Sequence, residues 1–278
     1  MVIITLLIVS ILACFIFKQK KIIIPLVLIT LSVAYFDQIV DIYGILSLVA
    51  LYCLSAFALN AKHDNPIYSI VAWCIFVPLL LGFMIHVVPG FKNPIWVQDI
   101  AISTLSRKFS LYIQFDKIMA GIIVLMNCQY IIDNAYKLNL RVSLVALTLC
   151  SSLLMALGII TNFIKIDMNI PSILLEWVIS NLLFVSLIEE IICRGIIQDK
   201  IKTVIPNQAS LSILFASVIF GCAHYRGGIV YIALSTIAGL FYGYAYDRTR
   251  SIINPIIVHF GLNLIHLLFF TYPSVVKL

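Results

Sequence analysis

The stretch Ile170–Gln198, with the sequence IPSILLEWVISNLLFVSLIEEIICRGIIQ, decides how the rest of the chain is interpreted. It is long enough to cross a bilayer, since a spanning helix needs about 20 mostly apolar residues. Glu189, Glu190 and Arg194 nevertheless lie inside it. An ionised side chain at the centre of a bilayer costs at least about 2.5 to 3.5 kcal/mol, so charges at this depth usually mark a functional site. The stretch therefore predicts a membrane helix that carries a polar site.

The composition of the whole chain agrees with a membrane protein. Of the 278 residues, 63% are hydrophobic and 11% are charged, whereas soluble domains are about half apolar and a quarter charged. Further apolar segments lie near residues 3–17, 22–36, 43–59, 68–88, 118–132, 143–163, 209–224, 229–245 and 252–270. The sequence predicts an all-α, polytopic bundle of about eight to ten transmembrane spans, because the first two segments are short enough for one to be re-entrant or interfacial.

The loops indicate how the chain is oriented in the bilayer. Lys18, Lys20 and Lys21 lie in the set of loops that is richer in basic residues, so the positive-inside rule predicts that this set faces the cytosol and that both termini lie outside it. The net charge of +6 follows these loops, and we expect no nucleic-acid partner. The long loop at residues 89–116 is expected to lie on the membrane surface or to form a short hairpin.

The two adjacent glutamates are expected to play different parts. On an α-helix Glu190 and Arg194 are four residues apart and share a face, whereas Glu189 is rotated away by about 100°. We therefore expect Glu190 to pair with Arg194. A structural alternative is that both glutamates and Arg194 form an ion-pair cluster that holds helices together.

Two later segments carry histidines with a partner four residues away. Phe220 pairs in this way with His224, and His259 pairs with Asn263. Counted at about 1.5 Å per residue, Glu189 and His259 can share a depth, whereas His224 lies deeper unless its helix is tilted. A partly dehydrated carboxylate is a suitable general base near neutral pH, and a nearby His can share the attacking water. A second His and an Asn amide are suitable donors to an oxyanion.

The same residues permit a second kind of chemistry. Glu189, His224 and His259 could hold a zinc ion, since two His and a carboxylate with an open position form a known catalytic set. The sequence contains no HExxH motif. A zinc site would therefore depend on convergence of these three residues in the fold.

The three motifs resemble those of the CPBP family, which includes the CAAX proteases and the bacteriocin-processing enzymes also called Abi proteins. The resemblance covers about residues 170–270. The family patterns EExxxR, FxxxH and HxxxN correspond in this chain to Glu189, Glu190 and Arg194, then Phe220 and His224, then His259 and Asn263.

The resemblance implies hydrolysis of a peptide bond within the membrane. In that reading Glu189 and His224 activate the water, and His259 and Asn263 form the oxyanion hole, with Glu190, Arg194 and Phe220 supporting them. An Asn paired with His259 suits an oxyanion site better than a ligand set, so we expect a glutamate protease without a cofactor and keep zinc as the alternative.

The motifs also divide the chain. Residues 1–165 are expected to be transmembrane helices without an assignable signature, and residues 166–278 a CPBP-like catalytic core. The expected function is cleavage of a hydrophobic or membrane-associated peptide or protein by a multi-pass enzyme of the plasma membrane, the inner membrane in bacteria. One alternative is a non-proteolytic immunity or signalling protein that uses the polar cluster structurally. Another is a proton-coupled transporter, because transporters also use intramembrane Glu and His.

Overall fold

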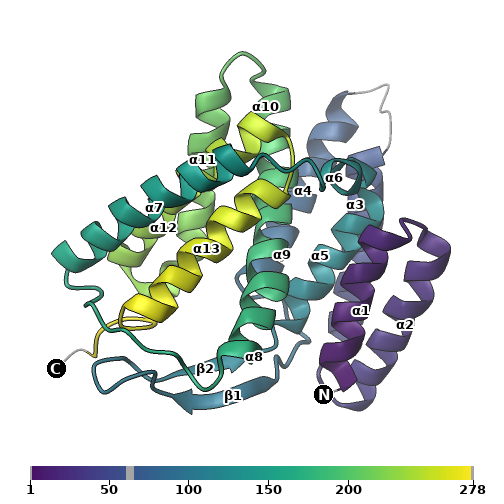
Figure 1. Ribbon diagram of the computed structural model, residues 1–278. Helices are drawn as coiled ribbons and strands as arrows, with labels where there is room; N and C mark the ends of the chain where they lie inside the picture. The colour runs from purple at the N-terminus through teal and green to yellow at the C-terminus, as the bar shows by residue number, and fades with distance from the viewer. Residues whose placement is uncertain (1, 61–65, 277–278) are drawn as a thin grey trace. The chain divides into compact units, whose positions relative to one another are not determined.

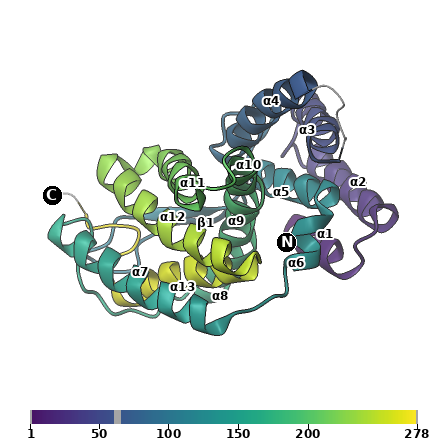
Figure 2. The same cartoon turned by 90° about the horizontal axis from the view of Figure 1, so that it is seen from above.

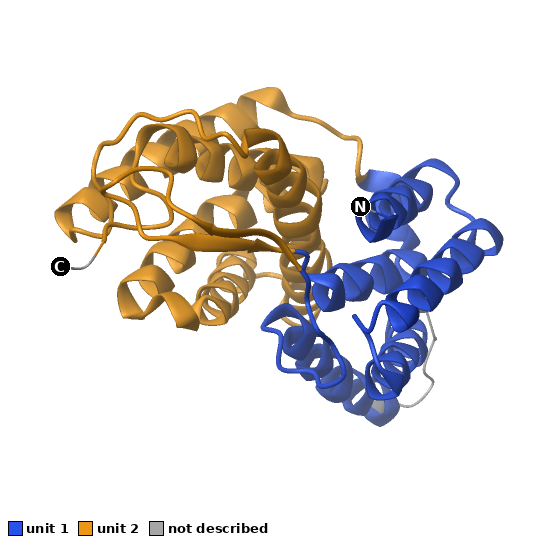
Figure 3. Cartoon of the chain, turned by 90° about the horizontal axis from the view of Figure 1, so that it is seen from below, with its two compact units in different colours: residues 1–94, 113–134 blue, residues 95–112, 135–278 orange. Residues whose placement is uncertain are grey.

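The chain folds into two compact units, of which the computed structural model describes residues 2–60 and 66–276. Unit 1 comprises Met1–Pro94 and Ile113–Asn134, and unit 2 comprises Ile95–Tyr112 and Ala135–Leu278 (Figure 3). Every motif residue lies in unit 2. The division expected at residue 165 separates the part of the chain with the motifs from the part without them. It was not a prediction of compact units, and it stays a prediction.

Unit 1 is built from helices that follow the expected apolar segments. They are α1 (Val2–Ile16), α2 (Lys20–Phe36), α3 (Ile42–Asn60), α4 (Pro66–Met84), α5 (Phe115–Asn127) and α6 (Gln129–Asn134). Helix α1 packs on α2 and α3 on α4, while α5 contacts α1, α3 and α4 and is buried along its whole length. The segment expected near 118–132 is divided at Cys128, whose backbone angles, φ −119° and ψ 76°, are not helical.

Unit 2 is built around one long helical stretch that contains two π-helical segments. The stretch runs through α8 (Leu174–Ile179), the π-helical η1 (Ser180–Ser186), α9 (Leu187–Glu190), the π-helical η2 (Ile191–Gln198) and α10 (Asp199–Val204). The other helices are α7 (Leu140–Ile160), α11 (Ala209–Ala223), the 3₁₀ turn η3 (Tyr225–Gly227), α12 (Ile229–Thr249) and α13 (Ile253–Phe269). Helices α11, α12 and α13 pack against the long stretch, and α7 packs on α12 and α13 (Figures 1 and 2).

The described residues confirm the all-α prediction, to which one small antiparallel sheet is added. Strands β1 (Ile95–Ile100) and β2 (Phe109–Tyr112) pair with two register shifts. The long loop was expected to lie on the membrane surface or to form a short hairpin, and it forms the hairpin. The alternation of apolar and polar residues from Phe109 onward favours a strand, whose successive side chains point to opposite faces. The chain is therefore helical with one added hairpin, as far as the described residues show.

The surface of the helices fits an integral membrane protein. Among the described residues, α3, α4, α7 and α12 are long and apolar enough to cross a membrane, and α1, α11 and α13 are shorter apolar helices. Only 28% of the spanning window of α3 or α4 is buried within the protein. Large apolar side chains exposed to this degree are explained by contact with hydrocarbon. The predicted total of eight to ten spans is not confirmed by these lengths.

Close approach of α11 and α12 sets the position of the site helices. A Cβ added at Gly221 would lie 1.9 Å from Oγ1 of Thr236, and one added at Gly239 would lie 3.0 Å from Cβ of Ser217. Small residues at such crossings allow helix backbones to approach closely. The contact brings α12 over the residues of η2.

Candidate active site

The glutamates lie on the one short α-helical turn between the two π-helical segments. Helix α9 holds Glu189 and Glu190, and η2 begins at the next residue and carries Arg194. Both glutamates are buried, with exposed fractions of 6% and 0%. Short π-helical segments within helices are frequent at functional sites. The sequence pattern, read with an ordinary helical period, did not predict them.

Glu190 is held by two partners on opposite sides. One carboxylate oxygen, Oε2, lies 3.2 Å from Nε of Arg194, as the four-residue spacing predicted. The other, Oε1, lies 2.8 Å from Nδ1 of His259 on α13. An ionised carboxylate can only accept, so Nδ1 of His259 donates this hydrogen bond. Glu190 therefore ties α9 to α13 as well as forming the expected ion pair.

His259 stands between the two glutamates. With Nδ1 directed to Glu190, its other ring nitrogen, Nε2, lies 4.0 Å from Oε2 of Glu189. The imidazole is only 3% exposed. A hydrogen bond at one ring nitrogen fixes the orientation of a histidine and the state of the other nitrogen. The contact with Glu189 therefore comes from a ring whose orientation Glu190 determines.

Arg194 is fully buried and has partners besides Glu190. Its Nη2 donates to the carbonyl oxygen of Gly239 at 3.0 Å. The guanidinium lies 4.7 Å from the ring centroid of Phe220 and 5.4 Å from that of Tyr242. A guanidinium over an aromatic face gains cation–π energy, particularly when it is desolvated. These contacts place the Phe220 ring against the buried ion pair, and its role in the site stays a prediction.

His224 joins the site through the aromatic ring of Phe220. It follows the last residue of α11, and its Nδ1 lies 2.8 Å from the carbonyl oxygen of Phe220. Since a carbonyl can only accept, Nδ1 donates, and Nε2 of a neutral ring is left as an acceptor. The Phe220 ring lies 4.7 Å from His224 and 5.7 Å from His259, measured between ring centroids. Phe220 thus contacts both histidines of the site.

Asn263 has a partner that the sequence did not indicate. It lies one turn beyond His259 on α13, and its Nδ2 donates to Oδ1 of Asn181 at 3.2 Å. The same oxygen of Asn181, which lies in η1, is 3.3 Å from the hydroxyl of Ser186. The amide of Asn263 is therefore oriented by the helix that carries the glutamates.

Tyr242 is the other site residue that the sequence analysis missed. Its ring stacks on His259 with centroids 4.7 Å apart and an interplanar angle of 15°. Gln198 meets the same helix, because its Nε2 donates to the carbonyl oxygen of Gly243 at 3.0 Å. A signal was present in the pattern Gly239–Leu–Phe–Tyr–Gly243, since two glycines four residues apart are typical of a close helix contact in membranes.

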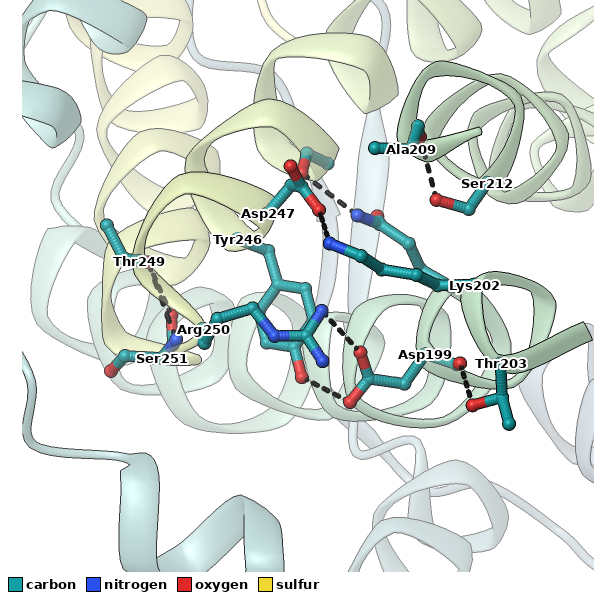
Figure 4. Close-up of polar contacts among 12 residues, drawn as sticks. Asp199, Lys202, Thr203, Ala209, Ser212, Tyr246, Asp247, Thr249, Arg250 and Ser251 are labelled. Carbon is teal, nitrogen blue, oxygen red and sulfur yellow. Dashed lines mark hydrogen bonds and ion pairs between the residues drawn. The ribbon is translucent and has the colours of Figure 1, made fainter. Parts of the chain in front are cut away.

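Beyond Gln198, a cluster of charged residues fastens α10 to the end of α12 (Figure 4). Nη1 of Arg250 lies 2.9 Å from Oδ1 of Asp199, and the hydroxyl of Tyr246 donates to the other oxygen at 2.8 Å. Lys202 pairs with Asp247 beside them. Burial raises the pKa of Asp199, while the hydrogen bond of Tyr246 and the charge of Arg250 oppose that shift. The cluster therefore fixes the position of α10 against α12. Helix α10 continues the helical stretch that carries the glutamates.

The alternative zinc set consists of Glu189, His224 and His259. Among the described residues, no three His, Cys, Asp or Glu side chains are grouped so that they could hold a metal ion. The Nδ1 atoms of His224 and His259 are engaged with a carbonyl and a carboxylate, respectively. Such Nδ1 contacts are also typical of metal-bound histidines, so zinc stays the alternative, and the chemistry proposed below has no step through a metal ion.

Comparison with known proteins finds one family to which part of unit 2 is similar. The family model of type II CAAX prenyl endopeptidase Rce1-like proteins matches residues 171–265. No curated protein and no solved structure matches the chain. The matched segment contains all three motifs, and the family indicates a protease. The match over residues 171–265 supports the resemblance of this integral membrane protein to the CPBP family of CAAX-protease-like proteins.

Proposed function

We propose that the chain is an intramembrane endopeptidase that hydrolyses a peptide bond in a membrane-associated peptide or protein. The observation that carries the proposal is the arrangement of His259. One ring nitrogen bonds to Glu190 at 2.8 Å, the other lies 4.0 Å from Glu189, and all three side chains are buried. Pairs of titratable groups with unequal surroundings are typical of acid–base sites.

Glu189 is the proposed general base. Its carboxylate takes a proton from a water molecule, and the water oxygen attacks the carbonyl carbon of the scissile bond. Nε2 of His224 accepts a hydrogen bond from the second O–H of the water, in keeping with the Nδ1 donation to Phe220. A positioned general base of this kind contributes about 10²- to 10⁴-fold to the rate.

His259 and Asn263 are the proposed oxyanion donors. The attack converts the carbonyl oxygen to an anion, which the Nε2 proton of a positively charged His259 would stabilise. Glu190 supports that charge because its carboxylate lies against Nδ1. Asn263 has two amide hydrogens and uses one of them on Asn181. When the intermediate collapses, the C–N bond breaks and Glu189 returns its proton to the leaving amine.

The proposed substrate class is a membrane-associated peptide or protein. The family name refers to prenylated CAAX tails, whereas no described contact of this chain selects a prenyl group. The enzyme would act within the lipid bilayer, without a cofactor and without nucleic acid.

The test is a comparison of membrane proteomes between cells with the wild-type protein and cells with Glu189→Gln. The chain has three glutamates, so Glu176→Gln, at a partly exposed position outside the motifs, is a matched control. We expect an uncleaved substrate to accumulate in Glu189→Gln and not in Glu176→Gln. A chelator should leave cleavage by the wild type unchanged, and loss of cleavage with the chelator would instead support a zinc enzyme.

A second function remains of interest because the contacts of Glu190 also join helices. To hold its helices together, a non-proteolytic immunity or signalling protein would need only the ion pair of Glu190 with Arg194 and its hydrogen bond from His259. Its phenotype would survive Glu189→Gln and His224→Gln. Loss of the phenotype in both variants, with normal amounts of protein, would support the protease.

A further inference from the structure

A small cavity lies in unit 1, far along the sequence from the motifs. Its volume is about 160 Å³, and it opens between the α1–α2 turn and the junction of α5 with α6. Lys18, Lys20 and Gln129 contribute polar groups, and most of the remaining wall consists of apolar side chains from α2, α5 and α6. A cavity with a basic side and an apolar side suits an anionic amphiphile.

Lys20 brings to this cavity a positive charge that is held by neutral groups. Its Nζ donates to Oδ1 of Asn127 at 2.6 Å and lies 5.6 Å from the centroid of the Tyr52 ring. Asn127 is buried and is itself fixed, since its Nδ2 donates to the hydroxyl of Ser55 at 2.8 Å. Within residues 2–60 and 66–276, Lys20 has no carboxylate partner.

Lys18 differs from Lys20 in this respect. Its Nζ lies 3.0 Å from Oδ1 of Asp133, and that pair is exposed to solvent. The negative charge of Asp133 balances that of Lys18. Lys20 therefore brings to the cavity a positive charge that no carboxylate among the described residues balances.

The backbone at the same place also favours an anion. Helix α2 begins at Lys20, and Gln19 in front of it makes no capping hydrogen bond with its side chain. The first N–H groups of a helix lack partners within the helix, and the helix dipole favours negative charge at this end. The ammonium group of Lys20 and the N-terminal end of α2 therefore both favour an anion at this place.

The bilayer supplies a ligand of this chemistry. Leu28 and Ile29 on the following turns of α2 are 58% and 50% exposed, as expected for side chains that contact acyl chains. Basic pockets between transmembrane helices bind the head groups of anionic lipids. We propose that the cavity binds the phosphate of an anionic membrane phospholipid, and that Lys20 is its principal cation.

The proposal is tested on the purified full-length protein by thermal unfolding. The protein is placed in nanodiscs of phosphatidylcholine alone or with phosphatidylglycerol, and inorganic phosphate is added to the first kind as a separate arm. Lys20→Gln removes the charge but keeps an amide that can bond to Asn127. Lys21→Gln is the matched control, because Lys21 is an exposed neighbour outside the cavity wall.

Phosphatidylglycerol should raise the unfolding temperature of the wild type and of Lys21→Gln by the same amount, and the gain should largely disappear in Lys20→Gln. Inorganic phosphate should give little gain. Equal gains in the two lysine variants would show a general surface-charge effect and overturn the site. A full gain from inorganic phosphate would overturn the lipid as occupant.

A second variant tests the place of binding without removing a lysine. Gln129 is exposed and lines the cavity, and its Nε2 donates to Oδ1 of Asp133. Gln129→Glu adds a negative charge there, and its unfolding temperature in phosphatidylcholine alone serves as the baseline for its gain. The gain from phosphatidylglycerol should fall in this variant. An unchanged gain would place the lipid elsewhere.

Discussion

Replacing Glu190 with glutamine removes the charge that balances Arg194 and leaves the shape of the side chain almost unchanged. Arg194 is fully buried, 3.2 Å from the lost carboxylate oxygen. The amide oxygen of glutamine can still accept the hydrogen bond from Nδ1 of His259. The cost of Glu190→Gln therefore comes from the unbalanced guanidinium.

The size of that cost follows from the burial of the pair. Removing one partner of a buried ion pair costs about 3 to 5 kcal/mol. Arg194 keeps the Gly239 carbonyl and the faces of two aromatic rings, so the lower part of the range, about 3 to 4 kcal/mol, is expected. At about 2 to 4 °C per kcal/mol for a domain of this size, the unfolding temperature should fall by about 6 to 16 °C.

The assay is thermal unfolding in one detergent, followed by intrinsic fluorescence. Asp133→Asn is the matched control, because it removes the carboxylate of the solvent-exposed pair with Lys18, and exposed ion pairs contribute little to stability. The double variant Glu190→Gln with Arg194→Gln should recover part of the loss, since both charges are then absent. If Glu190→Gln unfolds at the temperature of Asp133→Asn, the buried pair does not stabilise the fold as argued.

Two further predictions concern the packing and the charged cluster of unit 2. Gly221→Ala should lower the unfolding temperature because its Cβ would lie 1.9 Å from Oγ1 of Thr236, and adding Thr236→Ala should restore part of the loss; no recovery in the thermal assay would contradict this close contact. Burial raises the pKa of Asp199, so the charged carboxylate destabilises the folded state above that pKa and the penalty disappears as the pH falls through it. Asp199→Asn should therefore unfold at a higher temperature than the wild type at neutral pH, with a difference that shrinks in acid; a difference that grows in acid would reverse the argued sign.

The sequence predicted those parts of the fold that depend on one helix at a time. Apolar length located the helices, and the four-residue spacing predicted the contact of Glu190 with Arg194. The π-helical segments were not predicted, because the same residues are compatible with an ordinary helix. The segment expected at 170–198 in fact begins its helix at Leu174 and continues to Val204.

Contacts between helices were harder to predict than contacts along them. The bond of His259 to Glu190 and the stacking of Tyr242 on His259 depend on which faces of α9, α12 and α13 meet. No spacing within one segment contains that information. Asn181 was missed for the same reason, since it lies eight positions before Glu189 and meets the site only through Asn263 on another helix.

The central claim is that Glu189 acts in chemistry while Glu190 acts in holding the site. The direct measurement is the rate at which the purified, reconstituted protein cleaves the substrate found by proteomics, for the wild type, Glu189→Gln and Glu176→Gln, each with its unfolding temperature. Glu189→Gln should cleave about 10²- to 10⁴-fold more slowly while it unfolds close to the wild type, and Glu176→Gln should match the wild type in both. Cleavage by Glu189→Gln at the wild-type rate would remove Glu189 from the mechanism.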